Sequence, residues 1–207
     1  MLGRLISANF RHPKGILGRI AGNIMARGNE PEIRWTVDLL NIQPDDHVLE
    51  VGFGPGVGIQ YAARKALTGF VAGLDFSDTM VQVASKRNQD ALKAGRVALR
   101  QGDVAALPYP ADAFDKAFGV HCLYFWAKPA VGLAELRRVL KPKGQLALTM
   151  TPKDKWPPAQ LPPADLFTLY QPEEVASLFS EAGWHAIRVE TFPEPGRFPG
   201  VSVVASK

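Results

Sequence analysis

Four glycines stand at alternate positions in the stretch HVLEVGFGPGVGIQ, which runs from His47 to Gln60. A glycine between a strand and a helix permits a positive φ and lets a ligand touch the main chain. A turn that serves packing alone needs one glycine, so four at this spacing indicate a ligand that lies against the backbone. The four are Gly52, Gly54, Gly56 and Gly58.

The spacing of these glycines argues against a dinucleotide. Dinucleotide loops follow the pattern G-x-G-x-x-G and aim the next helix at a pyrophosphate. Counted from Gly52 or Gly54, the third glycine of that pattern would fall on Val57 or Ile59. Pro55 also removes one backbone donor from the loop. The observed pattern, G-x-G-x-G, suits a ligand without a diphosphate.

Two acidic residues at predicted strand ends suit the rest of a nucleotide-like ligand. Asp75 ends the second strand, 19 residues after Gly56, where an acid can hydrogen-bond ribose hydroxyls. Asp103 ends the third strand, where a carboxylate can accept from an exocyclic amine such as that of adenine. The structural alternatives are a helix cap for Asp75, although Ser77 is better placed, and a turn residue for Asp103.

The elements that must position these residues alternate between strand and helix. Strands are predicted over residues 47–51, 69–75, 96–103, 114–123, 145–150, 185–192 and 201–207. The last two have no room for a helix between them, so they should pair antiparallel. The predicted fold class is α/β: a Rossmann-like, doubly wound, seven-stranded sheet, mostly parallel, with one antiparallel strand near an edge and helices on both faces.

Helix signals fill the intervals between these strands. Asn29 is expected to cap the first helix, with Glu32 completing a variant of the capping box. A second helix is predicted over residues 57–67. Ser77 should cap a third helix, whose inner face is formed by Met80, Val83, Ala84 and Ala91.

The second half of the chain carries two more helix signals and one unusual segment. A helix marked by Leu133, Leu136 and Leu140 should end at residues 141–144, and another should begin at Pro172 and end before Gly183. Five prolines keep residues 151–167 from forming a long helix. This segment is either a stiff connector or a cover over the carboxyl edge of the sheet.

Length and composition indicate one globular domain. The chain has 207 residues, and its longest uncharged run, residues 51–63, has 13 residues, against the roughly 20 needed to span a bilayer. A single cysteine, Cys122, excludes an internal disulfide and fits a reducing compartment. We therefore expect a cytoplasmic protein without a bound metal.

The positive charge belongs to an N-terminal arm. Residues 1–29 carry five basic residues and no acid, whereas the remaining residues carry 19 basic and 20 acidic ones, a net charge of −1. We divide the chain into a basic lid or arm over residues 1–29 and a single domain over residues 30–207. Alternatives for the arm are contact with an anionic membrane or lipid, and a transit leader. Five charges among apolar residues make a nucleic-acid partner the weaker prediction.

Four motifs occur in a characteristic order: VLEVGFGPG, GLDFSDTM, GDVAALPYPADAFD and ELRRVLKPKGQLAL. With them, most of residues 47–150 resembles the class I S-adenosylmethionine-dependent methyltransferases. The similarity is to the small-molecule type 11 group, which includes enzymes of ubiquinone and menaquinone biosynthesis. A weaker similarity continues in LYQPEEVASLFSEAGW. The motif KPKG departs from the family, which more often has a second glycine there.

This resemblance implies S-adenosylmethionine as cofactor, S-adenosylhomocysteine as product, and a role for each matching residue. Gly52, Gly54 and Gly56 would pass under the methionine part, and Glu50 would lie near its amino group. Asp75 would hold the ribose. The residues implied around the adenine are Phe76 and Met80 beside the ring, Asp103 at its amine, and Val104 with its amide toward the ring.

The resemblance also places His121 near the sulfonium and the methyl group. A general base is needed when the acceptor is a hydroxyl, a protonated amine or an acidic carbon. His121 and Tyr124 are the main candidates, and a purely structural role for His121 stays open. Phe125 and Trp126 could line an apolar pocket or pack the next helix. Cys122 is not expected to act as a nucleophile.

The predicted function is transfer of a methyl group from S-adenosylmethionine to a small, partly apolar molecule at an oxygen, nitrogen or carbon atom. One alternative is a sensor or partner subunit that binds the cofactor without catalysis. A second alternative, disfavoured by the glycine spacing, is an NAD(P)-dependent oxidoreductase.

Overall fold

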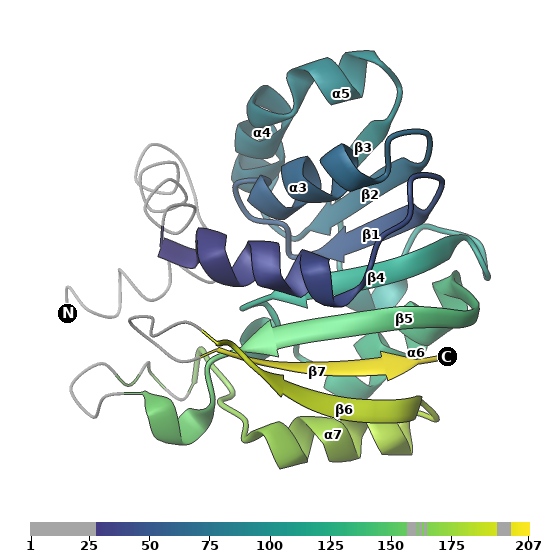
Figure 1. Cartoon of the computed structure of the whole chain (residues 1–207). Coiled ribbons are helices and arrows are strands. Elements are labelled where there is room, and N and C mark those ends of the chain that lie inside the picture. The colour runs from purple at the N-terminus through teal and green to yellow at the C-terminus, as the bar shows by residue number, and fades with distance from the viewer. Residues whose placement is uncertain (1–27, 157–160, 162, 164, 194–199) are drawn as a thin grey trace.

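The computed structural model describes residues 28–156, 161, 163, 165–193 and 200–207. Most of the predicted N-terminal arm and the centre of the proline-rich segment lie outside the described residues. Seven strands form one sheet in the order β3-β2-β1-β4-β5-β7-β6 (Figure 1). They are β1 (His47–Val51), β2 (Phe70–Asp75), β3 (Val97–Gln101), β4 (Phe114–Val120), β5 (Leu140–Met150), β6 (His185–Thr191) and β7 (Val201–Ser206).

The strand directions confirm the predicted sheet. The pairs β1–β2, β2–β3, β1–β4 and β4–β5 are parallel, whereas β7 is antiparallel to both β5 and β6. β1 is the first strand of the sheet and lies between β2 and β4, so the winding direction reverses there. In such sheets the crevice at the carboxyl ends of the strands around this point is the usual ligand site.

Helices cover both faces of the sheet (Figure 1). On one face Val48 of β1 packs in a core with Val37 of the helix over residues 28–39 and with Ile59 of α3. On the other face Leu49 packs with residues of α6 and α7, such as Leu136. The labelled helices are α3 (Val57–Lys65), α4 (Asp78–Arg87), α5 (Gln89–Lys93), α6 (Pro129–Val139) and α7 (Pro172–Glu181).

Several residues that were expected to mark helix ends do so in the structure. The Ser77 side chain accepts a hydrogen bond from the Met80 amide and caps α4. α7 begins at Pro172, and Gly183 follows its end with a φ of 79°. Three short 3₁₀ turns connect the larger elements: η1 (Val104–Ala106), η2 (Leu123–Phe125) and η3 (Lys153–Lys155).

Three helix predictions need correction. Asn29 is not an N-cap, because residue 28 is already helical. The helix predicted over residues 57–67 ends at Lys65. The helix after Ser77 is interrupted at Asn88, whose side-chain amide donates to the carbonyls of Gly56 and Ala84 at 3.0 and 2.9 Å. This amide bonds the end of α4 to the glycine loop.

Two strand boundaries differ from the prediction by three residues or more, and several others differ by one or two residues. β4 ends at Val120, because His121 has a φ of 54° and leaves the extended conformation. Residues 141–144 do not follow the helix as a turn, because α6 ends at Val139 and β5 begins at Leu140. The extra residues in β5 are accommodated by a shift in its register with β4 between Phe114 and Lys116.

Within the described residues, none of the helices combines the length and apolarity needed to cross a bilayer.

Candidate functional site

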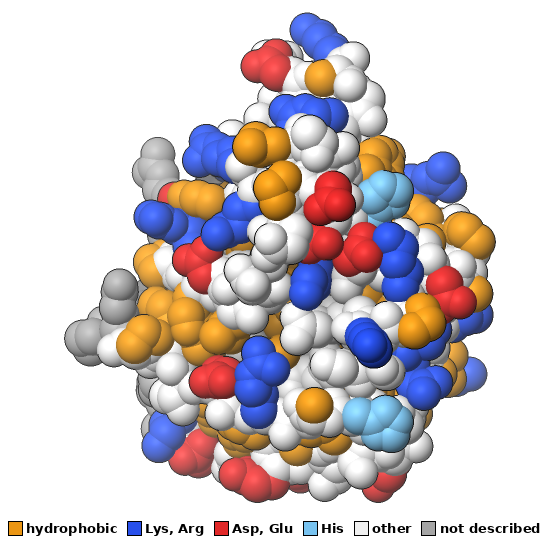
Figure 2. Space-filling view, turned by 45° about the vertical axis from the view of Figure 1, so that its right-hand side comes forward, with side chains coloured by type: hydrophobic (Ala, Val, Ile, Leu, Met, Phe, Trp, Pro, Cys, Tyr) orange, Lys and Arg blue, Asp and Glu red, His pale blue; other side chains and the backbone are white. Residues whose placement is uncertain are grey.

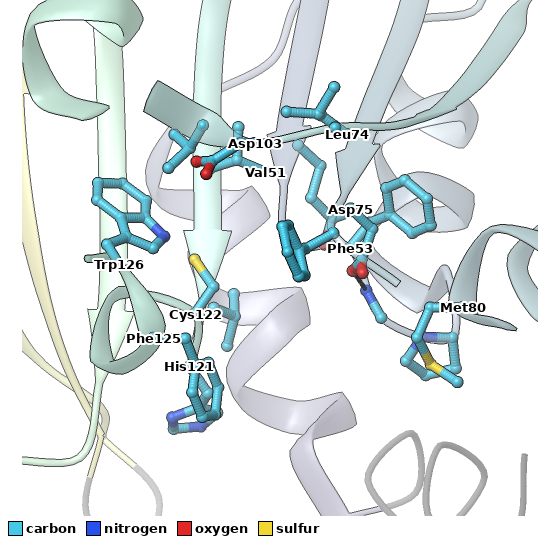
Figure 3. A pocket seen from close by; sticks show the side chains of 18 of the residues that line it. Val51, Phe53, Leu74, Asp75, Met80, Asp103, His121, Cys122, Phe125 and Trp126 are labelled. Atoms are coloured by element: carbon cyan, nitrogen blue, oxygen red, sulfur yellow. Dashed lines mark hydrogen bonds between the residues drawn. The ribbon is translucent and has the colours of Figure 1, made fainter. Parts of the chain in front are cut away.

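A cavity of about 310 Å³ opens at the carboxyl edge of the sheet (Figure 3). Its walls come from the glycine loop, the ends of β2, β3 and β4, and the helix over residues 28–39. The residues that line it are Asn29, Ile33, Met80 and residues 50–55, 74–76, 102–104, 120–122 and 125–127. Nine of the predicted cofactor residues are therefore brought together, whereas Gly56 and Tyr124 are not in this lining.

The glycines of the loop have different roles. A Cβ on Gly52 would come within 2.5 Å of the Cys122 Cβ, and one on Gly56 within 2.6 Å of the Ala84 Cβ. A Cβ on Gly58 would collide with the Glu50 carboxylate. Gly54, with a φ of 50°, has nothing within 4 Å of its Cβ position. Packing thus explains three of the glycines, and Gly54 leaves space for a ligand.

Asp75 links the second strand to the glycine loop. Its two carboxylate oxygens accept hydrogen bonds from the Gly54 amide at 2.7 Å and from the Ser77 amide at 2.8 Å. Burial raises the pKa of Asp75, and the two amide donors oppose that rise. Asp75 bonds the residue that caps α4 and does not itself cap that helix, and its carboxylate lines the cavity and keeps lone pairs for ligand hydroxyls.

Glu50 carries a buried carboxylate oxygen without a hydrogen-bond partner. The residue is 2% exposed, and its Oε2 has no partner among the described residues. Burial raises the pKa of Glu50 well above its usual range, and the nearby charge of Asp75 raises it further. A carboxylate left in this state at a cavity wall fits a ligand that brings a positive charge, such as an ammonium group.

The residues predicted around an adenine also line the cavity. Phe76 is 56% exposed and Met80 is buried, and both line the cavity. Asp103 accepts from the Ala105 amide at 2.9 Å and caps η1, which begins at Val104. The turn role of Asp103 is therefore real, and its place in the cavity lining is compatible with a ligand contact as well.

A further part of the cavity lining is aromatic and apolar. Figure 3 shows Cys122, Phe125 and Trp126 facing Phe53 and Asp75 across the cavity. Phe125 packs edge-on against Phe167, whose ring centroid is 4.7 Å away, so the end of the proline-rich segment supports this wall. Burial raises the pKa of the Cys122 thiol, which agrees with the prediction that it is not a nucleophile.

His121 lines the cavity, but both of its ring nitrogens have partners outside the lining. Nε2 lies 2.5 Å from Glu32 Oε2, and Nδ1 lies 3.2 Å from the Tyr124 hydroxyl. Neither Glu32 nor Tyr124 is a lining residue. In this arrangement the imidazole offers the cavity no unpartnered nitrogen, and the role of His121 as a general base stays a prediction.

The Tyr124 hydroxyl lies next to His121 and is buried. The residue is 4% exposed, and its hydroxyl accepts from the Thr151 amide at 2.5 Å. Burial raises the pKa of Tyr124 far above its ordinary value. In this arrangement the hydroxyl is bound to the main chain and to His121, so Tyr124 positions His121, and its catalytic role stays a prediction.

The sequence prediction missed Glu32 as a site residue and assigned it to a helix cap. One signal was available: Glu32 and Thr36 stand four residues apart, next to the apolar face formed by Ile33 and Val37. All four are buried. A buried glutamate in an amphipathic helix needs a partner, but no local pattern indicates that this partner is His121.

The carboxylates in the described lining of the cavity have no lysine or arginine beside them. Glu50, Asp75 and Asp103 are acidic, and no lysine or arginine belongs to the described part of the lining. The acidic side therefore favours a cationic ligand and opposes an anionic one. Within the described residues, no group of three or more His, Cys, Asp or Glu residues is arranged to hold a metal ion.

Comparison with known proteins identifies similar chains. A family model described as a methyltransferase domain matches residues 49–148. An uncharacterized methyltransferase of Bacillus subtilis, YdaC, is 36% identical over 135 residues, which cover 65% of this chain and 72% of that protein.

The ubiquinone/menaquinone biosynthesis C-methyltransferase UbiE of Geotalea daltonii is 30% identical over 119 residues, which cover 56% of this chain and 49% of that protein. This chain thus spans about half the length of that relative. A solved S-adenosylmethionine-dependent methyltransferase from Aquifex aeolicus is 25% identical, with a TM-score of 0.70, and the match covers 88% of this chain and 92% of that chain.

The different surroundings of the glycines predict different effects of an added methyl group. We expect Gly54→Ala to fold with a modest loss of stability, because its Cβ meets open space although an alanine is strained at a φ of 50°, and to weaken S-adenosylhomocysteine binding by about tenfold or more, because the methyl group occupies space meant for the ligand. Gly56→Ala should instead lower the free energy of unfolding by about 1–3 kcal/mol, because its Cβ meets Ala84. Calorimetry and urea unfolding separate the two effects; equal losses of affinity and stability in both variants would contradict this assignment.

We expect the buried Glu50 carboxylate to lower the stability of the ligand-free protein and to strengthen ligand binding. The folded-state pKa of Glu50 is raised, so its ionisation costs stability above the ordinary glutamate pKa and costs nothing below it. Glu50→Gln should therefore raise the free energy of unfolding at pH 7 by about 0.5–2 kcal/mol. That gain should vanish below about pH 4.

The same substitution should weaken S-adenosylhomocysteine binding by about tenfold, because the ammonium loses its counter-charge. Urea unfolding at several pH values and calorimetry measure the two quantities. A destabilised variant that binds as tightly as the parent protein would be the opposite of this expectation.

Proposed function

The chain belongs to the S-adenosylmethionine-dependent methyltransferases, and from this we propose that its methyl acceptor is a small, partly apolar molecule that is uncharged or cationic. The observation that carries the proposal is the composition of the cavity lining. It contains the carboxylates of Glu50, Asp75 and Asp103 together with the aromatic rings of Phe125 and Trp126, and its described part contains no lysine or arginine. An anionic acceptor would meet unfavourable charge there.

The three acidic residues of the lining are among those that would hold the cofactor. Glu50 would bind the amino group, and Asp75 the ribose, while Gly54 leaves the main chain open to the ligand. Phe76 and Met80 would flank the adenine, with Asp103 at its amine. When bound, S-adenosylmethionine supplies a methyl group on a cationic sulfur, which is a good leaving group.

The aromatic wall would orient the acceptor and exclude water. Phe125 and Trp126 present apolar rings, and the neighbouring ring of His121 is fixed by its own hydrogen bonds. Alignment of two reactants in a dry site can supply much of the rate of a methyl transfer. This arrangement favours acceptors that arrive as nucleophiles, such as neutral amines, thiolates or acidic hydroxyls, because neither His121 nor Tyr124 has an unpartnered basic atom.

The place where the N-terminal arm joins the described chain supports a role for the arm as a lid over the acceptor. Asn29 lines the cavity, so the arm joins the described chain beside the site. Its arginines and apolar residues would also suit contact with a lipid surface if the acceptor is membrane-derived. The UbiE relative is named for ubiquinone/menaquinone biosynthesis, which is in keeping with an apolar acceptor.

A nucleic-acid acceptor receives less support. Figure 2 shows a face on which basic and acidic side chains are interspersed, unlike the extended basic surface that binds a phosphate backbone. A cytoplasmic location remains a prediction from composition.

A panel of size-matched acceptors tests the proposed acceptor class. Methyl-labelled S-adenosylmethionine would be incubated with apolar phenols and amines and with their carboxylated or phosphorylated counterparts. We expect kcat/KM for the uncharged and cationic members to exceed that of the anionic members by about tenfold or more, because of the acidic lining. A preference for the anionic members would contradict the proposal. Methyl transfer to any member would also exclude the non-catalytic alternative.

A further inference from the structure

Glu32 and His121 connect two parts of the chain that lie far apart in the sequence. Glu32 Oε2 is 2.5 Å from His121 Nε2, across a separation of 89 residues. The Glu32 side chain is 10% exposed and that of His121 is 18% exposed, so water screens the contact little. The helix over residues 28–39 is thereby joined to the carboxyl end of β4.

The surroundings of His121 hold it firmly on the sheet side of this contact. Its φ of 54° is uncommon for a residue other than glycine, and its amide donates to the Thr149 carbonyl at 2.8 Å. Its Nδ1 is bound to the Tyr124 hydroxyl, which Thr151 fixes in turn. A strained residue persists where its neighbours over-determine the conformation, and such residues gather at functional sites.

The residues around Glu32 leave space for its carboxylate and bond the helix that carries it. A Cβ on Gly200 would lie 2.8 Å from Glu32 Oε1, so the glycine makes room for the carboxylate. One turn along, Thr36 donates to the Glu32 carbonyl at 2.7 Å, and its hydroxyl lies 2.6 Å from that of Thr149. Glu32 and Thr36, the polar residues on this side of the helix, therefore bond to the ends of β4 and β5.

Two residues of the cavity wall belong to the same helix as Glu32. Asn29 and Ile33 both line the cavity, and Ile33 packs against Val57 at the start of α3. We propose that Glu32 is a positioning residue, which acts through His121 to hold the helix over residues 28–39 as a wall of the cofactor site. The proposal rests on the proposed function only in taking this cavity as the place where the cofactor binds.

The proposal also explains why both nitrogens of His121 are occupied. An imidazole that serves as a base must turn one unprotonated nitrogen toward the acceptor. Here the ring instead bridges Glu32 and Tyr124, which belong to the helix and to η2. His121 therefore contributes to the site mainly by fixing the position of the helix.

Variants of both partners test the contact in the full chain. Glu32→Leu removes the carboxylate, and Glu32→Gln keeps an oxygen that can accept from Nε2. His121→Asn removes the imidazole while tolerating the positive φ. Glu30→Gln is the matched control, because Glu30 lies on the same helix and accepts from the Tyr61 hydroxyl away from the cavity.

Two measurements report on the helix and on the site separately. Amide hydrogen exchange of residues 28–39 in the ligand-free protein should rise by at least about tenfold in Glu32→Leu and His121→Asn, with β1 and β4 unchanged. Calorimetry should show S-adenosylhomocysteine affinity lowered by about three- to tenfold in both. The double variant should add little to either effect, because the two residues act as one unit. Glu32→Gln should show a smaller change, and Glu30→Gln none.

Unchanged exchange in Glu32→Leu and His121→Asn would overturn the proposal, and His121→Asn decides alone if Glu32→Leu does not fold. Faster exchange with unchanged affinity would also overturn it, because the helix would then not shape the site. Failure of the parent protein to bind S-adenosylhomocysteine would instead count against the proposed function, and the exchange data would still decide whether Glu32 fastens the helix.

Discussion

The hydrogen bond from the Gly54 amide to Asp75 holds the glycine loop across the carboxyl ends of β1 and β2. With the loop in this place, the Cβ position of Gly54 faces open space, and the buried Glu50 carboxylate stands at the cavity wall. The same loop is closely packed, because Ala84 leaves no room for a side chain on Gly56 and Cys122, which also lines the cavity, leaves none on Gly52. Close packing of the glycine loop and the acidic residues of the cavity therefore define the cofactor half of the site.

Glu50 and the Glu32–His121 pair illustrate two ways in which buried charge is used. Glu32 is satisfied within the protein by the imidazole, so it can hold two elements together. Glu50 has an oxygen without such a partner, so it keeps its capacity to bind for a ligand. The unpartnered oxygen makes the free protein less stable than it would be with a partner. A cationic group that binds there supplies the missing partner, and this is the physical basis for its affinity.

Local patterns in the sequence were enough to predict much of the fold. Residues 47–51 form a strand with the predicted bounds, and Ser77 and Gly183 mark helix ends, because these features depend on neighbouring residues alone. The convergence of Glu50, Asp75 and Asp103 was predictable because the carboxyl ends of parallel strands meet at one edge.

Features that depend on tertiary packing were not predictable in this way. The break at Asn88 arises from a hydrogen bond to Gly56, 32 residues away, and the partner of His121 lies 89 residues away. His121 and Tyr124 were predicted as catalytic from their place after the fourth strand, but their hydrogen bonds point to positioning instead. The residue types were therefore informative about location, whereas their roles followed from partners that no local pattern specifies.

A crystal structure of the protein with S-adenosylhomocysteine would test the central claim most directly. The account predicts the ligand in the cavity beside Gly54, with its amino group within hydrogen-bonding distance, about 2.7–3.2 Å, of Glu50 Oε2. A ligand bound elsewhere, or one that leaves Glu50 Oε2 without a partner, would contradict it.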